Sequence, residues 1–363
     1  MFDPEKLKVC FLAGTLGRGG SERQLVYMLE ALRQNGLATR VLCLTQGEPF
    51  EKEIIELGIS VQHVAREGSS RLGKLNNIIR SLRREPADIL QSIHFYTNLY
   101  AAVAARVTGA KEIGAIRSNL DVDLRSAGVI GRLNLKVPRH HITNSSTARE
   151  QAVARGVALN RIDLIPNVVS IKNENHLHRK NNGTVRLLFV GRLTEEKRAD
   201  RFLRIVSSIA EQAPGVGIKA AVAGDGPLRP QIESLARTLG LAEKVEMLGE
   251  RSDMSAVYQQ ADLLLLTSDL EGTPNVILEA MAHALPVAAT KVGGVPVLLG
   301  QDRGFMSDPS DEQGLAGAAL RLVTNPNLRS ELGRVGQEYV KRFHSHTQLH
   351  KQLMGIYEKV LSA

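Results

Sequence analysis

The chain has 363 residues, enough for two domains that each bury a sizeable core. Hydrophobic residues make up 43% of it and charged residues 23%, a balance typical of soluble globular proteins. Cys10 and Cys43 both lie in apolar strand-like runs, so neither a disulfide framework nor a metal cluster is indicated and a reducing cytosol is expected. The first apolar run is too short for a signal peptide or a membrane span, and no later run approaches the roughly 18 residues of a spanning helix.

The net charge of +8 is unevenly distributed. Residues 1–175 hold 24 Lys and Arg against 17 Asp and Glu, whereas residues 176–363 hold 22 against 21. A basic N-terminal half suits an anionic membrane, a phosphorylated acceptor or nucleic acid, although ordinary solubilising charge explains it equally well. No nucleic-acid-binding motif is visible and only 4% of the residues are aromatic, so nucleic acid is not expected as a partner.

Short apolar runs alternate with amphipathic stretches through the first half. Strands are expected at residues 8–13, 39–44, 61–64, 88–92 and 112–118. Helices are expected at residues 50–57, 74–84 and 99–107, and another opens at Ser21. This alternation is typical of a doubly wound α/β domain with a parallel sheet.

A glycine-rich loop at residues 14–20 joins the first expected strand to the helix that opens at Ser21. Its backbone N–H groups would lie at the carboxyl edge of the sheet. The loop matches neither the dinucleotide fingerprint nor the P-loop, and most such loops are only tight turns. His94 follows the expected strand at 88–92, and Arg117 lies at the end of the one at 112–118, so both would reach the same edge, although a lone histidine is more often structural.

Two polar stretches precede a second set of strands and helices. Residues 121–141 mix Arg and Lys with Leu, Val and Ile, which fits either an interfacial amphipathic segment or a surface helix of the N-terminal domain. Residues 171–183 are polar and rich in Asn, as expected for an interdomain linker. The alternation then resumes, with strands at 185–190, 220–223, 245–248, 262–266 and 286–290 and helices at 253–260, 274–284, 311–323, 326–342 and 346–361.

The turn after the strand 185–190 carries two cations. Gly191 ends the strand, Arg192 and Lys197 follow it, and an amphipathic helix comes next. An arginine fork and a lysine point charge would bind a diphosphate from two sides. Taken alone, these residues are more often part of a solvated loop.

The stretch from Glu271 to Gly294 has the pattern of a loop, a helix and a buried strand. Thr273 is suited to cap a helix over residues 274–284, and Pro274 is suited to its first position. Because the first N–H groups of a helix have no partner within it, this start is a ready site for a phosphate.

Two carboxylates, Glu271 and Glu279, border that helix start, near the N–H groups of Asn275 and Val276. A carboxylate accepts two hydroxyl hydrogen bonds, so it suits a sugar or a ribose diol. As isolated residues, both are more often solvated surface charges.

Taken together, these segments resemble a known family. EGTPNVILEAMA, LPVAAT and VGG resemble the E-x7-E block of the retaining glycosyltransferases of family 4. GRLTEEK resembles the G-R-L-x-x-x-K motif of these enzymes, and GRGGSERQL and IHFYTNLYAA resemble their N-terminal glycine and histidine loops. The likeness covers essentially the whole chain and is strongest over residues 186–294.

The resemblance implies the α/β fold called GT-B, in which two Rossmann-like, doubly wound parallel-sheet domains face a cleft. The expected parts are an acceptor-binding domain over 1–170, a linker over 171–183, a nucleotide-sugar-binding domain over 184–345 and a C-terminal helix over 346–363 that crosses back to the N-domain.

By the same resemblance, the catalytic residues are Arg192, Lys197 and Glu271. Arg192 and Lys197 would stabilise the departing diphosphate, Glu271 would orient the sugar hydroxyls, and Glu279 would hold the ribose diol. The expected donor-binding residues are Gly20, His94, Gly191, Arg192, Lys197, Arg251, Glu271, Gly272, Thr273, Pro274, Asn275, Val276 and Glu279. The expected acceptor-side residues are Gly19, Gly20, His94 and Arg117. No metal-binding acidic pair is evident, so neither a metal nor a cofactor is expected.

Three positions depart from the family pattern. Arg198 stands where Gly often follows the lysine, and we expect it to narrow the pocket or to add charge. Ala284 stands where Gly is common at the helix end, and we expect tighter packing there. Val168 also stands where the family usually has Gly, so the backbone there is expected to differ.

The implied function is a metal-independent hexosyl transfer, with retention of the anomeric configuration, from a nucleotide-diphosphate sugar. A UDP-sugar is the first expectation and GDP-mannose the second. The expected acceptor is a saccharide or lipid-linked intermediate of polysaccharide or glycolipid biosynthesis. It would be met in the cytoplasm, possibly at the inner face of an anionic membrane contacted by the basic N-terminal domain.

Two alternatives stay open. One is another GT-B chemistry, an epimerase or a phosphorylase; a phosphorylase would need a lysine-bound pyridoxal cofactor. The other is a non-catalytic regulatory protein that binds a nucleotide sugar. Such a protein need not keep Arg192, Lys197, Glu271 and Glu279 together.

Overall fold

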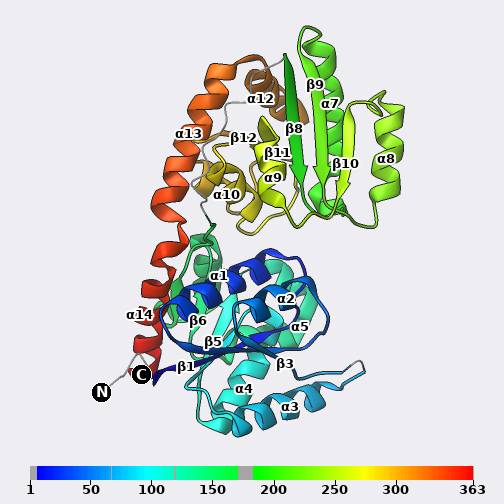
Figure 1. Cartoon of the computed structure of the whole chain (residues 1–363). Coiled ribbons are helices and arrows are strands. Elements are labelled where there is room, and N and C mark those ends of the chain that lie inside the picture. Colours follow the sequence, from blue (N-terminus) through cyan, green and yellow to red (C-terminus); the bar gives the residue numbers. More distant parts are fainter. Residues whose placement is uncertain (1–5, 67, 118–119, 171–182, 363) are drawn as a thin grey trace. The chain divides into compact units, whose positions relative to one another are not determined.

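The computed structural model describes residues 6–66, 68–117, 120–170 and 183–362. The chain divides into two units, drawn in Figure 1. The N-terminal unit comprises Met1–Val168 together with His346–Ala363, and the C-terminal unit comprises Val169–Ser345. The linker expected at 171–183 lies, apart from Gly183, outside the described residues.

The N-terminal unit is built on a parallel sheet of seven strands in the order β3-β2-β1-β4-β5-β6-β7. These strands are β1 Lys8–Ala13, β2 Ala38–Cys43, β3 Ser60–His63, β4 Ile89–Ser92, β5 Lys111–Ile116, β6 His141–Thr143 and β7 Ile162–Leu164. Val9 of β1 pairs with Thr39 of β2 on one side and with Ile89 of β4 on the other. The strand order therefore reverses between β1 and β4, and doubly wound sheets bind ligands beyond the carboxyl ends at such a point.

Helices cover both faces of this sheet. They are α1 Gly20–Gln34, α2 Pro49–Glu56, α3 Arg71–Arg84, α4 Asn98–Thr108, α5 Leu120–Lys136 and α6 Ser146–Ala154, with short 3-10 turns at η2 Phe95–Thr97, η3 Leu159–Arg161 and η5 His346–Gln348. Successive side chains of β1 point to opposite faces. Phe11 thus joins the core under α1 and α2, and Leu12 joins the core under α3 and α4.

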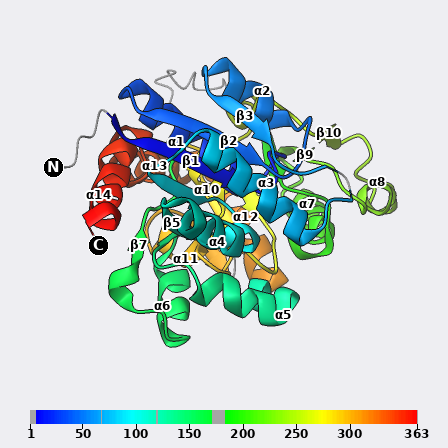
Figure 2. The ribbon, with the colours of Figure 1, turned by 90° about the horizontal axis from the view of Figure 1, so that it is seen from below.

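The last helix, α14 Leu349–Ser362, completes the N-terminal unit from the far end of the chain. Its residues Leu353 and Tyr357 are fully buried in the core that α1 shares. The Tyr357 hydroxyl donates to Oε1 of Gln91 on β4 at 2.7 Å. Figure 2 shows α14 beside β1 and α1. The expected return of the C-terminal helix to the N-domain is confirmed.

The C-terminal unit has a parallel sheet of six strands in the order β10-β9-β8-β11-β12-β13. The strands are β8 Thr184–Val190, β9 Gly217–Ala223, β10 Val245–Gly249, β11 Leu263–Leu266, β12 Val287–Thr290 and β13 Phe305–Ser307. β8 and β11 pair through Leu188 and Leu264. The loops that follow these two strands therefore leave the sheet side by side.

Helices again cover both faces of the sheet, as the alternation of the sequence predicts. They are α7 Ala199–Gln212, α8 Arg229–Thr238, α9 Met254–Gln259, α10 Asn275–Ala282, α11 Val295–Leu299, α12 Glu312–Thr324 and α13 Pro326–Phe343, with a 3-10 turn at η4 Glu195–Lys197. α7, α8 and α12 share one core, and α9, α10, α11 and α13 share the other. The predicted pair of doubly wound domains is confirmed, although the sequence pattern does not predict β6, β7, α6, α8, α11 or β13.

The ambiguous stretch 121–141 folds mainly as α5, which is kinked at Gly128, where φ is +53°. Leu135 is buried, whereas Val129 is 72% exposed, so only part of its apolar surface packs on the N-terminal unit. Within the described residues, no helix is long and apolar enough to cross a membrane.

Candidate active site

The loop after β8 carries Gly191 and Arg192. A Cβ on Gly224 would lie 1.9 Å from the Gly191 carbonyl oxygen, so the loops after β8 and β9 pass too closely for a side chain at position 224. Arg192 is 73% exposed, and its guanidinium lies 3.6 Å from Glu196. This exposed pair is weak, so the Arg192 guanidinium is available to a ligand.

Lys197 and Glu271 form an ion pair between the loops that follow β8 and β11. Nζ of Lys197 lies 2.7 Å from Oε1 of Glu271, and the two side chains are 21% and 9% exposed. The Ser268 hydroxyl donates to the same oxygen at 2.7 Å. A lysine ammonium has three donors. Lys197 can therefore hold Glu271 and still donate to a phosphate.

Arg198 has a left-handed backbone, with φ 54° and ψ 48°, which explains why glycine suits this position. Its guanidinium pairs with Asp200 at 3.0 Å and with Asp269 at 2.8 Å. The expectation that Arg198 adds charge for a ligand is therefore wrong, because two carboxylates of the chain itself neutralise it.

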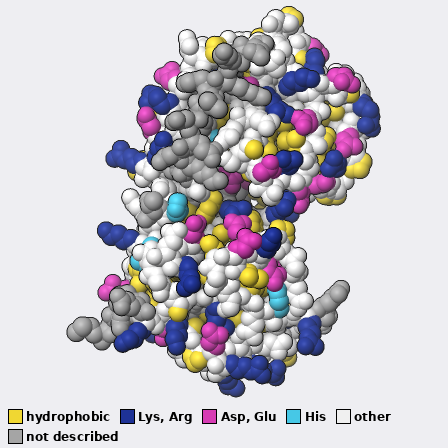
Figure 3. Space-filling model, in the orientation of Figure 1, with side chains coloured by type: hydrophobic (Ala, Val, Ile, Leu, Met, Phe, Trp, Pro, Cys, Tyr) yellow, Lys and Arg dark blue, Asp and Glu magenta, His cyan; other side chains and the backbone are white. Residues whose placement is uncertain are grey.

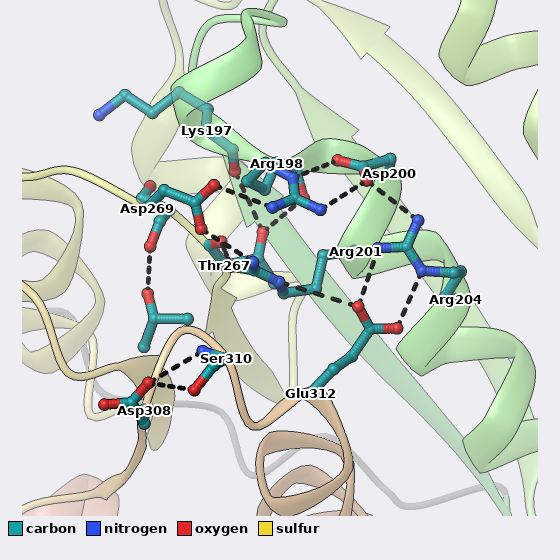
Figure 4. Close-up of polar contacts among 12 residues, drawn as sticks. Lys197, Arg198, Asp200, Arg201, Arg204, Thr267, Asp269, Asp308, Ser310 and Glu312 are labelled. Carbon is teal, nitrogen blue, oxygen red and sulfur yellow. Dashed lines mark hydrogen bonds and ion pairs between the residues drawn. The ribbon is translucent and has the colours of Figure 1, made fainter.

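Arg198 belongs to a six-residue ion-pair network, drawn in Figure 4. Its members are Arg198, Asp200, Arg201, Arg204, Asp269 and Glu312. Arg201 is only 4% exposed and lies 2.8 Å from Asp269, while Arg204 lies 2.8 Å from Glu312. The network thus ties the loop after β8 to the loop after β11 and to α12. The Lys197 side chain extends away from it (Figure 4).

The network favours the ionised form of two of its carboxylates, Asp200 and Asp269. Burial alone would raise the pKa of Asp200, but hydrogen bonds from Arg198 and Arg204 outweigh it and lower that pKa to about 2. Burial also opposes ionisation of Asp269, and Arg198 and Arg201 together lower its pKa. The Thr267 hydroxyl adds a hydrogen bond of 2.9 Å to the carbonyl oxygen of Arg198.

Gly293 and Gly294, from the VGG segment, pack against the loop that carries Glu271 and Gly272. Gly293 has φ +49°, and a Cβ there would lie 2.1 Å from the carbonyl oxygen of Glu271. The Gly294 N–H donates to the Gly272 carbonyl at 2.7 Å. The two glycines therefore allow the loop after β12 to pack closely against the backbone of Glu271 and Gly272 and to fix its position.

Helix α10 begins one residue later than expected. Pro274 is the N-cap residue, with ψ 110°, and no side chain caps the helix. The prediction that Thr273 is the N-cap is wrong, because the extended ψ of Pro274 keeps that residue outside the helix. The N–H groups of Asn275 and Val276 lie in the first turn, where the helix dipole favours an anion.

The end of α10 contains the second non-glycine residue with a left-handed backbone. Ala284 has φ +48°. Its N–H donates to the carbonyl of Met281 at 3.0 Å, and the N–H of Leu285 donates to the carbonyl of Ala280 at 2.9 Å. This is a Schellman motif, in which glycine normally occupies the position of Ala284. A Cβ on Gly333 would lie 2.0 Å from the Ala284 carbonyl oxygen, so α13 packs closely here.

Glu279 is held by a residue of α9. The Tyr258 hydroxyl donates to Oε2 of Glu279 at 2.7 Å. The Tyr258 ring stacks on His283 with centroids 5.3 Å apart, and His283 lies 2.9 Å from the Ser255 hydroxyl. Sequence reasoning missed Tyr258 and His283. The one available signal was the four-residue spacing of Glu279 and His283, which puts them on the same helix face.

Arg251 follows the edge strand β10 and is exposed. It pairs with Asp253 at 2.7 Å. No contact among the described residues joins it to Lys197 or Glu271. Its expected role in donor binding stays a prediction.

In the N-terminal unit, His94 links the glycine loop to α1. Its Nδ1 accepts a hydrogen bond from the Gly14 N–H at 3.1 Å, and its Nε2 lies 3.1 Å from Oε1 of Glu22. Tyr96 stacks on the His94 ring with centroids 5.3 Å apart. Because both ring nitrogens are engaged, His94 organises the loop; its expected contact with donor or acceptor stays a prediction.

The glycine loop also depends on its small residues. α1 begins at Gly20, and its N-cap residue Gly19 makes no side-chain cap. A Cβ on Gly19 would lie 2.2 Å from Oε2 of Glu22, which is 7% exposed. Glycine at position 19 therefore lets the loop close over this carboxylate.

A second carboxylate, Glu48, anchors the same loop and was missed from the sequence. It accepts hydrogen bonds from the Thr15 hydroxyl at 2.6 Å and from the Leu16 N–H. Burial would raise the pKa of Glu48, but the hydrogen bonds from Thr15, Thr45 and Leu16 lower it. Glu48 is therefore a fixed negative charge beneath the loop.

Arg117, the remaining expected acceptor-side residue, lies directly after β5 and is 9% exposed. It donates to Oδ1 of Asn167 at 3.1 Å. Val168 forms two hydrogen bonds with the side chain of Gln24, both of 2.8 Å. These contacts hold the segment after β7 against α1.

A separate pocket of about 370 Å³ lies beside β3 and α3. Its lining includes Arg66, Arg80 and Arg84 but none of the expected site residues. Figure 3 shows Lys and Arg side chains gathered where α3 lies in Figure 1. The basic excess of the N-terminal half is thus partly concentrated on this helix.

Two further observations concern metal ligands and thiols in the described part of the chain. No group of three or more His, Cys, Asp or Glu side chains there could hold a metal ion. Cys10 and Cys43 are free and buried. Burial raises the pKa of Cys10 to about 12, so its thiol stays protonated and unreactive.

The sequence matches two family models. Residues 18–173 match the model described as Glycosyltransferase Family 4, and residues 184–325 match Glycosyl transferases group 1. A relative from Campylobacter jejuni, GalNAc-alpha-(1->4)-GalNAc-alpha-(1->3)-diNAcBac-PP-undecaprenol alpha-1,4-N-acetyl-D-galactosaminyltransferase, is 25% identical over 93% of this chain and 94% of its own length. N-acetyl-alpha-D-glucosaminyl L-malate synthase from Bacillus anthracis is 30% identical, but over only 46% of this chain and 44% of its own.

Solved structures show the same fold. HepE from Anabaena, in complex with UDP and glucose, has a TM-score of 0.83 with 19% identity, and the match covers 97% of this chain and all of HepE. TarM has a TM-score of 0.82 with 13% identity over 98% of this chain and all of TarM. At these identities the likeness concerns the fold alone.

The chain has two parallel-sheet domains, a last helix that returns to the first domain, and motif-bearing loops at the carboxyl edges, which is the GT-B fold. Both family models describe glycosyltransferases, so the protein is a glycosyltransferase of this fold. The two family models cover most of both domains. The chain belongs to glycosyltransferase family 4.

Proposed function

We propose that this enzyme transfers a hexosyl unit from a nucleotide-diphosphate sugar to an acceptor hydroxyl, with retention of the anomeric configuration. A UDP-sugar is the favoured donor, and GDP-mannose is the second choice. Structures of HepE with UDP-glucose and of S. aureus TarM with UDP support this order. The observation that carries the proposal is the Lys197–Glu271 pair, which joins the loop after β8 to the loop that leads into α10 at the carboxyl edge of the second sheet.

The main catalytic task of the enzyme is to stabilise the departing diphosphate. As the bond from the anomeric carbon to the diphosphate oxygen breaks, negative charge grows on the leaving group. Arg192, Lys197 and the first-turn N–H groups of α10 would stabilise that charge, in place of a metal ion. One preorganised donor of this kind is typically worth about 100- to 1,000-fold in rate.

The two glutamates have separate tasks in this proposal. Glu271, fixed by Lys197 and Ser268, would orient hydroxyls of the donor sugar. Glu279, fixed by Tyr258, would accept hydrogen bonds from the ribose diol. We assign no covalent nucleophile. The two-carboxylate scheme of glycosidases does not apply, because these carboxylates serve different parts of the donor.

For the acceptor we propose a saccharide or lipid-linked intermediate that carries an anionic group, in polysaccharide or glycolipid biosynthesis. The names of several relatives contain such molecules: L-malate, PP-undecaprenol and, at 29% identity over 47% of this chain, D-inositol 3-phosphate. Each carries a carboxylate or a phosphate. The N-terminal unit, with its basic excess, would bind this partner.

We further propose that the enzyme works in the cytoplasm, at times on the inner face of the membrane. The basic helix α3 and the exposed Val129 on α5 support this contact. In vesicle sedimentation, binding to anionic lipid that weakens with salt is expected. Equal sedimentation with neutral and anionic vesicles would contradict the membrane role.

A thermal-shift screen with UDP, GDP, ADP and their common sugars tests the donor assignment. Ligands that bind the folded state raise the melting temperature by mass action. We expect a shift with UDP and its sugars that is lost in Arg192→Ala and in Glu279→Ala. The Lys219→Ala variant, altered at an exposed lysine of the same unit, should keep the full shift. If no nucleotide shifts the wild type, the donor assignment is wrong.

A further inference from the structure

Arg117 is a buried cation whose charge has few stabilising partners among the described residues. It lies directly after β5 and is 9% exposed. Its guanidinium donates to the neutral amide oxygen of Asn167 at 3.1 Å, and its Nε is buried without a hydrogen-bond partner. Among the described residues, no carboxylate pairs with it.

The other buried arginines in the described part of the chain have more partners, although Nε of Arg201 is also buried without a hydrogen bond, 3.8 Å from Glu312. Arg201 has the Asp269 carboxylate at 2.8 Å and the Thr267 carbonyl at 2.7 Å. Arg329 donates to the carbonyls of Leu322 and Val323, and Arg40 contacts Ser81, Glu85 and a backbone carbonyl. Among these four described arginines, Arg117 is therefore the one whose side chain makes a single hydrogen bond, and the acceptor of that bond is a neutral amide.

Burial does not remove the charge of Arg117. Desolvation lowers the pKa of its guanidinium to about 10, so the group is still protonated at neutral pH. A buried cation that lacks an anion is costly to the folded state. Sites where a chain tolerates such a cost are commonly those where a ligand supplies the missing partner.

The position of Arg117 suits a ligand as well as its charge does. The carboxyl ends of parallel strands meet at one edge of a sheet, and the three neighbouring strands β5, β6 and β7 end there in Arg117, Asn144 and the segment of Asn167. Asn144 is 5% exposed and donates to the Arg117 carbonyl at 3.1 Å. The backbone of Arg117 is thus fixed. Its planar guanidinium has further N–H donors with which it could bind an oxyanion through two hydrogen bonds.

We propose that Arg117 binds the anionic group of the acceptor, a phosphate or a carboxylate, at the carboxyl edge of the N-terminal sheet. This rests on the proposed function, because it names the acceptor class for that transfer. The fork would hold the anion, and the acceptor hydroxyl would be positioned relative to it. A phosphate and a carboxylate would each accept hydrogen bonds from the guanidinium in the same bidentate way.

The test is a titration of the full-length enzyme with inorganic phosphate and, in a second arm, with acetate, followed by calorimetry and by thermal shift. UDP is kept saturating so that the donor site is closed to phosphate. The variants are Arg117→Gln, Arg117→Lys and, as the control, Arg80→Gln in the basic pocket beside α3. Phosphate binding without acetate binding would point to a phosphorylated acceptor, and the reverse to a carboxylate.

We expect Arg117→Gln to weaken oxyanion binding roughly 10- to 100-fold, as for other hydrogen bonds to charged groups. Arg117→Lys should fall in between, because it keeps the charge but loses the fork. Arg80→Gln should bind as the wild type does. Without ligand, Arg117→Gln should melt at or above the wild-type temperature, since a buried unpaired charge has been removed.

Unchanged oxyanion binding in Arg117→Gln would overturn the proposal, and so would its loss in Arg80→Gln instead. Should Arg117→Gln fail to fold, wild-type binding in Arg117→Lys would overturn it. Failure of the donor assignment is recognised separately, because UDP would then cause no shift in any variant. In that event the same titrations are made in the Lys197→Ala background, where the diphosphate site is disabled.

Discussion

Lys197 and Glu271 are 74 positions apart, yet their side chains meet at 2.7 Å because β8 and β11 are neighbours in the sheet. Sequence reasoning selected both residues, but as separate contacts to different parts of the donor. The structure adds that each fixes the other before a ligand arrives. The pair therefore behaves as one preorganised unit.

Replacing Lys197 by Ala is expected to lower kcat about 100- to 1,000-fold, since the charge on the departing diphosphate loses a preorganised donor. Steady-state kinetics with the preferred UDP-sugar measure it. Lys219→Ala, which alters an exposed lysine of the same unit, should leave kcat unchanged. A loss of less than about tenfold in Lys197→Ala would show that Lys197 has no such role.

Ala284→Gly is expected to stabilise the C-terminal unit. The left-handed conformation destabilises a non-glycine residue by about 1–2 kcal/mol, which glycine would relieve. Glycine also loses more backbone entropy on folding, and this offsets about 0.5–1 kcal/mol of the gain. The net gain is about 1 kcal/mol, which would raise Tm by about 2–4 °C for a unit of this size. Ala282→Gly, at the last helical residue of α10, should instead lower Tm in the same calorimetric experiment.

At the scale of elements, the ion-pair network fixes the geometry between two loops and a helix. Sequence reasoning marked Arg198 as a departure from glycine that would narrow the pocket or add charge. The second alternative is wrong, because two carboxylates from different elements neutralise Arg198, and the first stays a prediction. Asp200 lies on α7 and Asp269 lies after β11. Only the packing of these elements brings the three side chains together.

Arg198→Gly is expected to lower kcat/KM for the donor about tenfold, the size of one lost charged hydrogen bond, because the loop of Lys197 loses two anchors. Its stability should change less, since glycine also relieves the left-handed backbone. High salt should narrow the gap to the wild type. Arg334→Ala, which removes an exposed helical ion pair in the same unit, is the control. If kcat/KM is unchanged, Arg198 does not position the loop.

The same network predicts a pH effect on stability. The pKa of Asp200 is about 2 in the folded state and 3.8 in a model peptide. Its contribution is therefore fully present above pH 3.8 and is lost as the pH falls towards 2. Urea unfolding at successive pH values should show a smaller acid-induced loss across this window in Asp200→Asn than in the wild type. Parallel curves would contradict the prediction.

Some elements could not be read from the sequence for physical reasons. α6 buries only Ala148 and Ala152, so its apolar face is too faint to stand out. α11 and β13 are too short to show a period. Their structure is decided by the surfaces on which they pack.

At the scale of the whole molecule, the N-terminal unit depends on both ends of the chain. α14 supplies Leu353 and Tyr357 to a core otherwise built by residues before Val168. A truncation after α13 would open this core. The unit therefore cannot be isolated by cutting the chain once, in the segment after Val168.

Leu353→Ala is expected to lower the free energy of unfolding by about 2–5 kcal/mol, the usual range when a buried leucine is replaced by alanine. The loss of stability should be confined to the N-terminal unit. In equilibrium unfolding experiments, the C-terminal unit should therefore still bind UDP when the N-terminal unit of the variant has unfolded. Lys351→Ala, on the exposed face of the same helix, should change stability by less than about 0.5 kcal/mol. Equal effects of the two substitutions would mean that α14 does not stabilise the unit.

The alternation of strands and helices, and hence the two doubly wound domains, follows from the amino-acid sequence, as does the place of each motif at the end of a strand. These properties are local, because they follow from the spacing of apolar residues and from glycines along the chain. Which charged side chains contact one another depends instead on the folded arrangement of the strands. The Lys197–Glu271 pair and the neutralised Arg198 depend on which strands are neighbours. The burial of Arg117, with which no carboxylate of the described residues pairs, depends on how far water is excluded. Pairing and desolvation are set by residues distant in sequence, which no local pattern contains.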